Sequence, residues 1–103
     1  MIERTLVNRI QRWCHTREIY CRKIHGDAFQ HRGMADLLIV VEGRALFLEC
    51  KTQGGQLSES QKAERLNVRR AGSIYIVCRT IGQATEAITF LMPTILGILP
   101  RYP

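Results

Sequence analysis

The sequence lacks closely spaced pairs of cysteine or histidine. Its four cysteines, at positions 14, 21, 50 and 78, are scattered without a CxxC pair, and three of them lie inside apolar runs. A structural zinc site usually draws on closely spaced Cys or His pairs, so these cysteines with His25 and His31 make a weak case for zinc. The pattern predicts reduced core cysteines, which are typical of cytoplasmic proteins.

The chain also lacks a segment that is long and apolar enough to cross a membrane. Its N-terminus carries Glu3 and no apolar stretch ahead of a cleavage site, which argues against a signal peptide. Repeats and low-complexity tracts are missing, and no proline occurs before residue 93. The length of 103 residues therefore predicts a single domain over 1–92. An apolar tail over 93–103 would pack back on the domain or, as we prefer, meet a partner chain.

Acidic residues are few compared with basic ones. The chain has 15 Lys and Arg against 9 Asp and Glu, for a formal charge of +6. This balance favours a polyanionic partner such as nucleic acid. A merely basic soluble protein would have the same composition.

The first half of the chain predicts a helix followed by three strands. Apolar residues recur at helical spacing from Ile2 to about Cys14. Extended segments are expected over 18–24 and 35–41, and the second is so apolar that we expect it to be covered on both faces. Glu42-Gly43 supplies a tight turn, so the strand ALFLECKT should return antiparallel.

The second half predicts two helices on either side of a strand. The spacing of a helix capping box occurs at 58–61, and this helix should end at Gly72. The apolar strand over 73–79 follows through a helical connection, so it should lie parallel to ALFLECKT. The capping-box spacing recurs at 80–83 and opens a third helix that ends before Pro93. The order α-β-β-β-α-β-α predicts an α/β fold with a mixed central sheet flanked by helices.

Strand alternation gathers three charges on one face of this sheet. Glu49 and Lys51 share a face of ALFLECKT because side chains alternate along a strand. With the turn at Glu42-Gly43, the numbers of each cross-strand pair sum to 85, so Asp36 falls opposite Glu49. Opposed residues have Cβ atoms about 4.5–5.5 Å apart, where like charges destabilise the sheet. A divalent cation between the carboxylates would remove this repulsion, and hard oxygen ligands suit Mg²⁺ or Mn²⁺.

Two further charges have alternative interpretations. Lys51 would lie beside the cation and could orient the attacking water or stabilise charge on a phosphate. It could instead form a cross-strand ion pair with one acid, which would leave the other acid without a role. On the first helix, Glu3 falls inside the apolar arc. It either points inward or turns outward to complement the helix N-terminus.

The second helix carries a polar, basic stripe. Its residues lie within about 100° of each other on the helical wheel, and they are Gln61, Lys62, Arg65 and Arg69. Such a stripe can hold a phosphate backbone, but a solvated helix face has the same composition. His31 and Arg32, in the loop ahead of Asp36, are likewise either backbone contacts or ordinary loop residues.

Three short stretches resemble the VRR-NUC family, the virus-type replication-repair nucleases of the PD-(D/E)xK nuclease superfamily. They are GMAD at 33–36, ECK at 49–51 and GGQLS at 54–58, which leads to Gln61. The resemblance runs from Glu3 to about Ile88 and implies a restriction-endonuclease-like αβββαβα core. Ala35 stands where the family usually has proline, which shapes the backbone and supplies no ligand.

The resemblance implies a phosphodiesterase that depends on Mg²⁺ or Mn²⁺. The catalytic residues would be Asp36, Glu49, Lys51 and Gln61. Asp36 and Glu49 would ligate the metal, with the backbone carbonyl of Cys50 completing the site and Glu3 acting as the first-helix acid, in indirect contact. DNA would be bound by His31, Arg32, Lys62, Arg65 and Arg69.

A chain this short resembles stand-alone phage and bacterial members of the family. These look like homodimers that act on branched DNA such as Holliday junctions, in the cytoplasm of a bacterium or a phage-infected host. The leading hypothesis is therefore a structure-selective DNA endonuclease, and the nearest alternative is a general DNA nickase. A catalytically silent nucleic-acid-binding module would be expected to lack an acid or the lysine, and none is missing. A cysteine hydrolase using Cys14 and His15 is disfavoured, because neighbours on a helix point about 100° apart.

Overall fold

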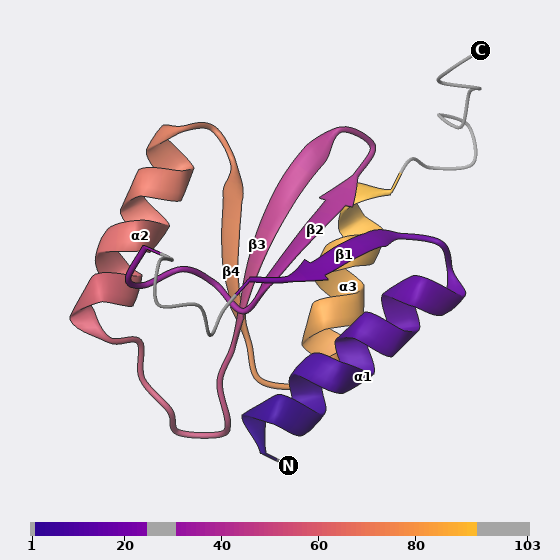
Figure 1. Ribbon diagram of the computed structural model, residues 1–103, viewed down its shortest axis with the longest axis horizontal. Coiled ribbons are helices and arrows are strands. Elements are labelled where there is room, and N and C mark those ends of the chain that lie inside the picture. Colours follow the sequence, from indigo (N-terminus) through magenta and orange to yellow (C-terminus); the bar gives the residue numbers. More distant parts are fainter. Residues whose placement is uncertain (1, 25–30, 93–103) are drawn as a thin grey trace.

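The computed structural model describes residues 2–24 and 31–92 (Figure 1). Within these residues the chain forms three helices and one four-stranded sheet in the predicted order. The elements are α1 (Glu3–Thr16), β1 (Tyr20–Lys23), β2 (Leu37–Val41), β3 (Arg44–Cys50), α2 (Glu59–Arg70), β4 (Ile74–Cys78) and α3 (Ile81–Leu91). The predicted α/β class is confirmed. The tail over 93–103 lies outside the described residues, so the domain boundary at 92 stays a prediction.

The sheet is mixed, with strand order β1-β2-β3-β4. The first three strands are antiparallel neighbours, and β4 lies parallel to β3. The hairpin between β2 and β3 turns through Glu42 and Gly43, whose φ angles of 54° and 78° are those of a two-residue turn with both central residues left-handed. Val41 pairs with Arg44, so the predicted register is confirmed.

The main core lies between the sheet and the helices α1 and α3, while α2 lies on the opposite side of the sheet (Figure 1). Alternate residues of β2 and β3 point into this core, among them Leu37, Ile39, Leu46 and Leu48. They meet Ile10 of α1 and Ile88 of α3, each of them fully buried. Because the apolar stripes of α1 and α3 cover this face of the sheet, the opposite face is left for a functional site.

The other face carries a smaller apolar cluster. Val68 of α2 packs there with Ala35 and Tyr75, and α2 contacts mainly β4. Leu38 and Val40 of β2 share this face and are only half-buried. The expectation that β2 is covered on both faces is therefore wrong for this face, because α2 packs over the β4 side of the sheet.

Capping interactions set the starts of α2 and α3. Ser58 Oγ accepts from the Gln61 N–H at 3.1 Å, and Gln61 Oε1 accepts from the Ser58 N–H at 2.9 Å, which completes the predicted capping box. At α3, Thr80 Oγ1 accepts from the Gln83 N–H at 3.1 Å. Gln83 Oε1 instead accepts from the N–H of Arg79, one residue before the cap, so the second box is only half formed.

The four cysteines are buried and free, as the sequence predicts. The thiol of Cys14 lies in the core, and its hydrogen bond to Cys21 together with burial raises its pKa well above the ordinary value. Burial and the raised pKa both disfavour the thiolate form that a nucleophilic cysteine needs. Among the described helices, none is long and apolar enough to span a membrane.

Candidate active site

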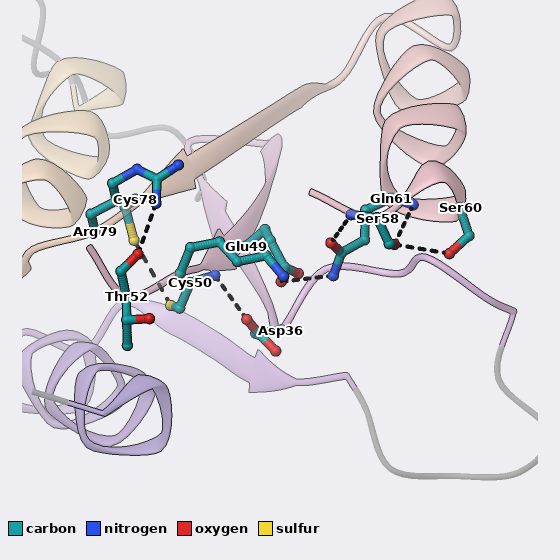
Figure 2. Close-up of polar contacts among 10 residues, drawn as sticks. Asp36, Glu49, Cys50, Thr52, Ser58, Ser60, Gln61, Cys78 and Arg79 are labelled. Carbon is teal, nitrogen blue, oxygen red and sulfur yellow. Dashed lines mark hydrogen bonds and ion pairs between the residues drawn. The ribbon is translucent and has the colours of Figure 1, made fainter. Parts of the chain in front are cut away.

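The register of the hairpin brings Asp36 and Glu49 together. Leu37 pairs with Leu48, so the next position outward sets Asp36 opposite Glu49. The carbonyl of Asp36 accepts from the Ile24 N–H at 2.9 Å, which continues the pairing with β1. Its carboxylate Oδ2 accepts from the Cys50 N–H at 2.8 Å (Figure 2). Asp36 is therefore held by both neighbouring strands.

Glu49 is the one charged residue that is buried within the described part of the chain, with 3% of its surface exposed. Its Oε2 accepts from Gln61 Nε2 at 2.9 Å and lies 3.6 Å from Lys51 Nζ. Its Oε1 is buried and has no hydrogen-bond partner among the described residues. Burial, followed by the charge of Asp36, raises the pKa of Glu49 to about 7, although Lys51 opposes the shift.

Lys51 lies at the end of β3, where its side chain is 15% exposed. Its N–H donates to the carbonyl of Cys78 at 3.0 Å, so the pairing with β4 fixes its backbone. Lys51 does contact one acid, but this acid is Glu49, two residues before it along the chain, and the contact is not the cross-strand pair of the alternative interpretation. Asp36 is left to the backbone amide of Cys50, and the two acids thus have different partners.

Gln61 connects α2 to the site, because one end of its amide group caps the helix and the other end contacts Glu49 (Figure 2). Its Oε1 closes the capping box with Ser58, and its Nε2 donates to Glu49. From the sequence, Gln61 is expected both in the capping box at 58–61 and among the catalytic residues. The structure gives it both contacts, because the first turn of α2 lies directly against the end of β3.

The loop before Asp36 packs tightly against the same turn of α2. Gly33 has φ of 86°, and a Cβ atom there would lie 2.2 Å from the carbonyl oxygen of Ser60. Glycine is therefore needed at this position for two reasons, the left-handed backbone and the close approach. The sequence analysis quoted Gly33 as part of a motif and gave it no structural role.

Two other residues of the site region were missed by the sequence analysis. Arg79 donates to the carbonyl of Thr52 at 2.8 Å and thereby ties the segment after Lys51 to the end of β4 (Figure 2). Tyr75 is buried with its hydroxyl unpartnered, and burial, followed by the charge of Glu49, raises its pKa. Tyr75 belongs to an apolar strand pattern, and only the position of Arg79 at the end of an apolar strand could have suggested a role.

The oxygen atoms of the site fit a small divalent cation. Glu49 Oε1 is buried without a partner, and Asp36 faces it across the hairpin. No group of three or more His, Cys, Asp or Glu side chains that could hold a metal occurs in the described ranges. Mg²⁺ is commonly bound by one or two carboxylates, with water and substrate phosphate completing its shell. The arrangement matches that pattern, although Cys50 is seen to contribute its amide N–H and its carbonyl stays a prediction.

Glu3 lies at the edge of the site. Its side chain is exposed, which favours the outward of its two interpretations. It nevertheless lines a small cavity together with Asp36, and its charge is the smallest contribution that raises the pKa of Glu49. Glu3 is thus a neighbour of the two acids and does not join them in a three-carboxylate group.

The stripe predicted on α2 divides into two parts. Gln61 and Arg65 are half-buried, and Arg65 Nε is buried without a hydrogen-bond partner among the described residues. Lys62 and Arg69 are exposed, and Lys62 Nζ lies 3.4 Å from Glu59. Gln61 contacts the site through Glu49, whereas Lys62 and Arg69 belong to a solvated basic face.

The two loop residues proposed for DNA binding are exposed. His31 Nε2 lies 3.6 Å from a carboxylate oxygen of Glu64 in α2. Arg32 precedes Gly33 at the surface of the same loop. His31 thus lies beside α2, and the role of both residues in binding stays a prediction.

Comparisons with known proteins agree with this geometry. No family model and no curated protein matches the sequence. Among solved structures, one described as a "VRR_NUC domain protein" is similar with a TM-score of 0.75 and 18% identity, over 88% of this chain and 88% of that chain. A second, described as a "VRR_NUC domain", is similar with a TM-score of 0.62 and 23% identity, over 80% of this chain and 92% of that chain. The chain therefore has the fold of VRR-NUC domain proteins.

Proposed function

We propose that this chain is a member of the VRR-NUC family and a metal-dependent, structure-selective DNA endonuclease. It would hydrolyse phosphodiester bonds in branched DNA such as Holliday junctions. The observation that supports this best is the facing pair Asp36 and Glu49, with one buried carboxylate oxygen unpartnered and Lys51 alongside. The fold shared with VRR-NUC domain proteins and the charge of +6 support a nucleic-acid substrate.

Asp36 and Glu49 would hold Mg²⁺ or Mn²⁺, with the Cys50 carbonyl as the third protein ligand. A divalent cation bound there supplies a Lewis acid that lowers the pKa of water and neutralises charge on the phosphate. The protein's part is orientation. The Cys50 amide fixes the Asp36 carboxylate, and Gln61 fixes that of Glu49.

Lys51 would act on the reacting groups. Its ammonium group lies beside Glu49 and is largely removed from solvent, so its charge is weakly screened. From this position it can orient the attacking water and stabilise negative charge that develops on the phosphate oxygens. The exposed Lys62 and Arg69, with Arg65, His31 and Arg32, would contact the DNA backbone without reading its sequence.

The central test is cleavage by site variants. Lys51→Ala and Asp36→Asn should each lower the cleavage rate by at least about 100-fold, while binding of branched DNA survives. Arg44→Ala, at the hairpin end of the sheet, should cleave at the normal rate. Cleavage is measured on a synthetic four-way junction with Mg²⁺, with Mn²⁺ and with EDTA. Unchanged cleavage by either site variant would refute the proposal.

The type of DNA substrate is tested with the same protein and the same four-way junction. A linear duplex and a four-way junction are compared under identical salt and metal, and the cut positions are mapped. Symmetric paired nicks in the junction are expected of a dimer that presents two sites to two strands. Scattered single nicks on both substrates would identify a general nickase, and the absence of cleavage on both would identify a binding module.

A further inference from the structure

A small cavity lies beside Asp36, on the side of the site away from α2. It has a volume of about 210 Å³ and lies where the first turn of α1 meets the end of β1. Its lining residues are Glu3, Arg4, Val7, Lys23 and Asp36. Two of these are cations from two different elements, and neither belongs to the set of residues proposed above to bind DNA.

Arg4 and Lys23 are free to bind a ligand. Both side chains are exposed, and neither makes an ion pair or a side-chain hydrogen bond in the part of the chain that the structure describes. Lys62, by comparison, is paired with Glu59. Two unpaired cations on the rim of one cavity suit an anion that both can reach, because neither has to give up a partner.

The net charge around the cavity becomes positive when the metal binds. Three acids at the site and its rim are balanced by three cations, and these six residues are Glu3, Asp36, Glu49, Arg4, Lys23 and Lys51. A divalent cation held by Asp36 and Glu49 would leave a net charge of two positive units. An anion is then attracted to the cavity, whereas the metal-free site is neutral overall.

The size and lining of the cavity restrict the anion. Pockets that hold drug-sized ligands measure about 300–1,000 Å³, so a cavity of about 210 Å³ is small for a nucleobase with its sugar. Val7 is its only apolar lining residue, and no aromatic ring is available for base stacking. A single phosphodiester group fits both constraints.

We propose that Arg4 and Lys23 form a subsite for the phosphodiester group next to the one that is cleaved. This inference rests on the proposed nuclease function. The cleaved strand would cross the end of the sheet, with α2 on one side of Asp36 and Glu49 and the Arg4–Lys23 subsite on the other. The subsite positions the strand and takes no part in the chemistry, so its loss should weaken binding more than it slows bound substrate.

The test measures salt-dependent binding in a background that does not cleave. Lys51→Ala protein with Mg²⁺ is titrated with a fluorescent four-way junction at several salt concentrations. Arg4→Ala and Lys23→Ala should each reduce the slope of log K against log salt by about one, and the double variant by about two. Lys23→Arg should keep the slope. Arg44→Ala is the matched control, because Arg44 is an exposed arginine at the far end of the sheet, and it should leave the slope unchanged.

A second measurement locates the phosphate. Uncharged methylphosphonate replaces one phosphate at a time around the cut position. Neutralising the phosphate next to the cut should weaken binding by the parent protein and have no further effect on the double variant. Equal effects at every position would show that the two residues act only as diffuse charge and would overturn the subsite.

The outcomes separate this inference from the proposed function. If wild-type protein cleaves the junction but the slopes of both single variants match that of the parent, the subsite is wrong and the nuclease stands. If the wild type does not cleave but both slopes fall, the proposed function fails and the phosphate contact stands. Lys51→Ala protein that binds no junction in Mg²⁺ would also overturn the subsite.

Discussion

Metal binding needs the ionised form of Glu49, although its surroundings in the metal-free protein favour the protonated form. Its carboxylate is buried beside Asp36, and both effects favour the protonated form. A cation would reverse this preference, because it stabilises the ionised carboxylate. Substitutions of Glu49 or of its partners should therefore change both the pH dependence of stability and the affinity for metal.

We expect stability without metal to fall as pH rises. The pKa of Glu49 is raised from 4.5 to about 7 in the folded chain, so its contribution is fully present below pH 4.5 and is lost as pH rises through about 7. Glu49→Gln should remove this dependence and raise the free energy of unfolding near pH 8 by up to about 3 kcal/mol. Urea unfolding in EDTA near pH 5 and near pH 8 measures the effect. The exposed Glu59→Gln should behave like wild type, and an unchanged pH slope in Glu49→Gln would contradict the assignment.

The two contacts of Gln61 can be separated by a pair of variants. Gln61→Ala loses the cap and the bond to Glu49, whereas Ser58→Ala loses the Oγ cap and keeps the Glu49 bond. Both should lower the free energy of unfolding by about 0.5–2 kcal/mol. Only Gln61→Ala should also lower Mg²⁺ affinity, by about 10- to 100-fold, because it frees a metal-binding carboxylate. The two variants are distinguished by measuring cleavage and thermal stability at increasing Mg²⁺ concentration. Equal metal affinities of the two variants would show that Gln61 acts only as a capping residue.

At the scale of elements, the site depends on where α2 meets the loop before β2. Gly33→Ala should push the loop away from α2, since a Cβ atom there would lie 2.2 Å from Ser60 O. Gly54→Ala is the matched control, with φ of 83° and open space around it. We expect about 1 kcal/mol of destabilisation from the backbone strain in both variants, and about 1–3 kcal/mol more in Gly33→Ala. Thermal or urea unfolding measures this, and equal losses would show that the contact is easily relaxed.

The element scale also shows what can be predicted from a sequence of this kind. Alternation along β3 and a two-residue turn were enough to bring Asp36, Glu49 and Lys51 together, because both depend on local geometry. The approach of Gly33 to Ser60 and the bond from Arg79 to Thr52 join segments far apart in the chain, and no local pattern encodes them. Glu3 stayed ambiguous because a residue in the first turn of a helix can turn either way.

At the scale of the whole molecule, a large aromatic side chain is exposed near the end of the described residues. Phe90 is 83% exposed near the end of α3, and the apolar run ILGIL follows a few residues later in the sequence. We propose that this end of the chain contributes to a homodimer interface. A large exposed aromatic side chain is a typical anchor of such interfaces.

The dimer can be tested by sedimentation velocity at several protein concentrations. Phe90→Ser should raise the dimer dissociation constant by about tenfold or more, corresponding to about 1.4 kcal/mol. Leu66→Ser is the control, because Leu66 is an exposed apolar residue on α2, at 51% exposure. A wild-type chain that stays monomeric at all concentrations would contradict the proposal, as would an equal effect of Leu66→Ser.

The turn at Glu42 and Gly43 has a consequence for how such chains can diverge. A substitution there has to preserve the left-handed backbone of Glu42 and Gly43, and it leaves the register of the hairpin unchanged. An inserted or deleted residue is different, because it shifts β3 against β2 by one position and sends every side chain to the opposite face. Related chains should therefore keep the length of this turn, since a change in length would part the two acids and disorder the core in a single step.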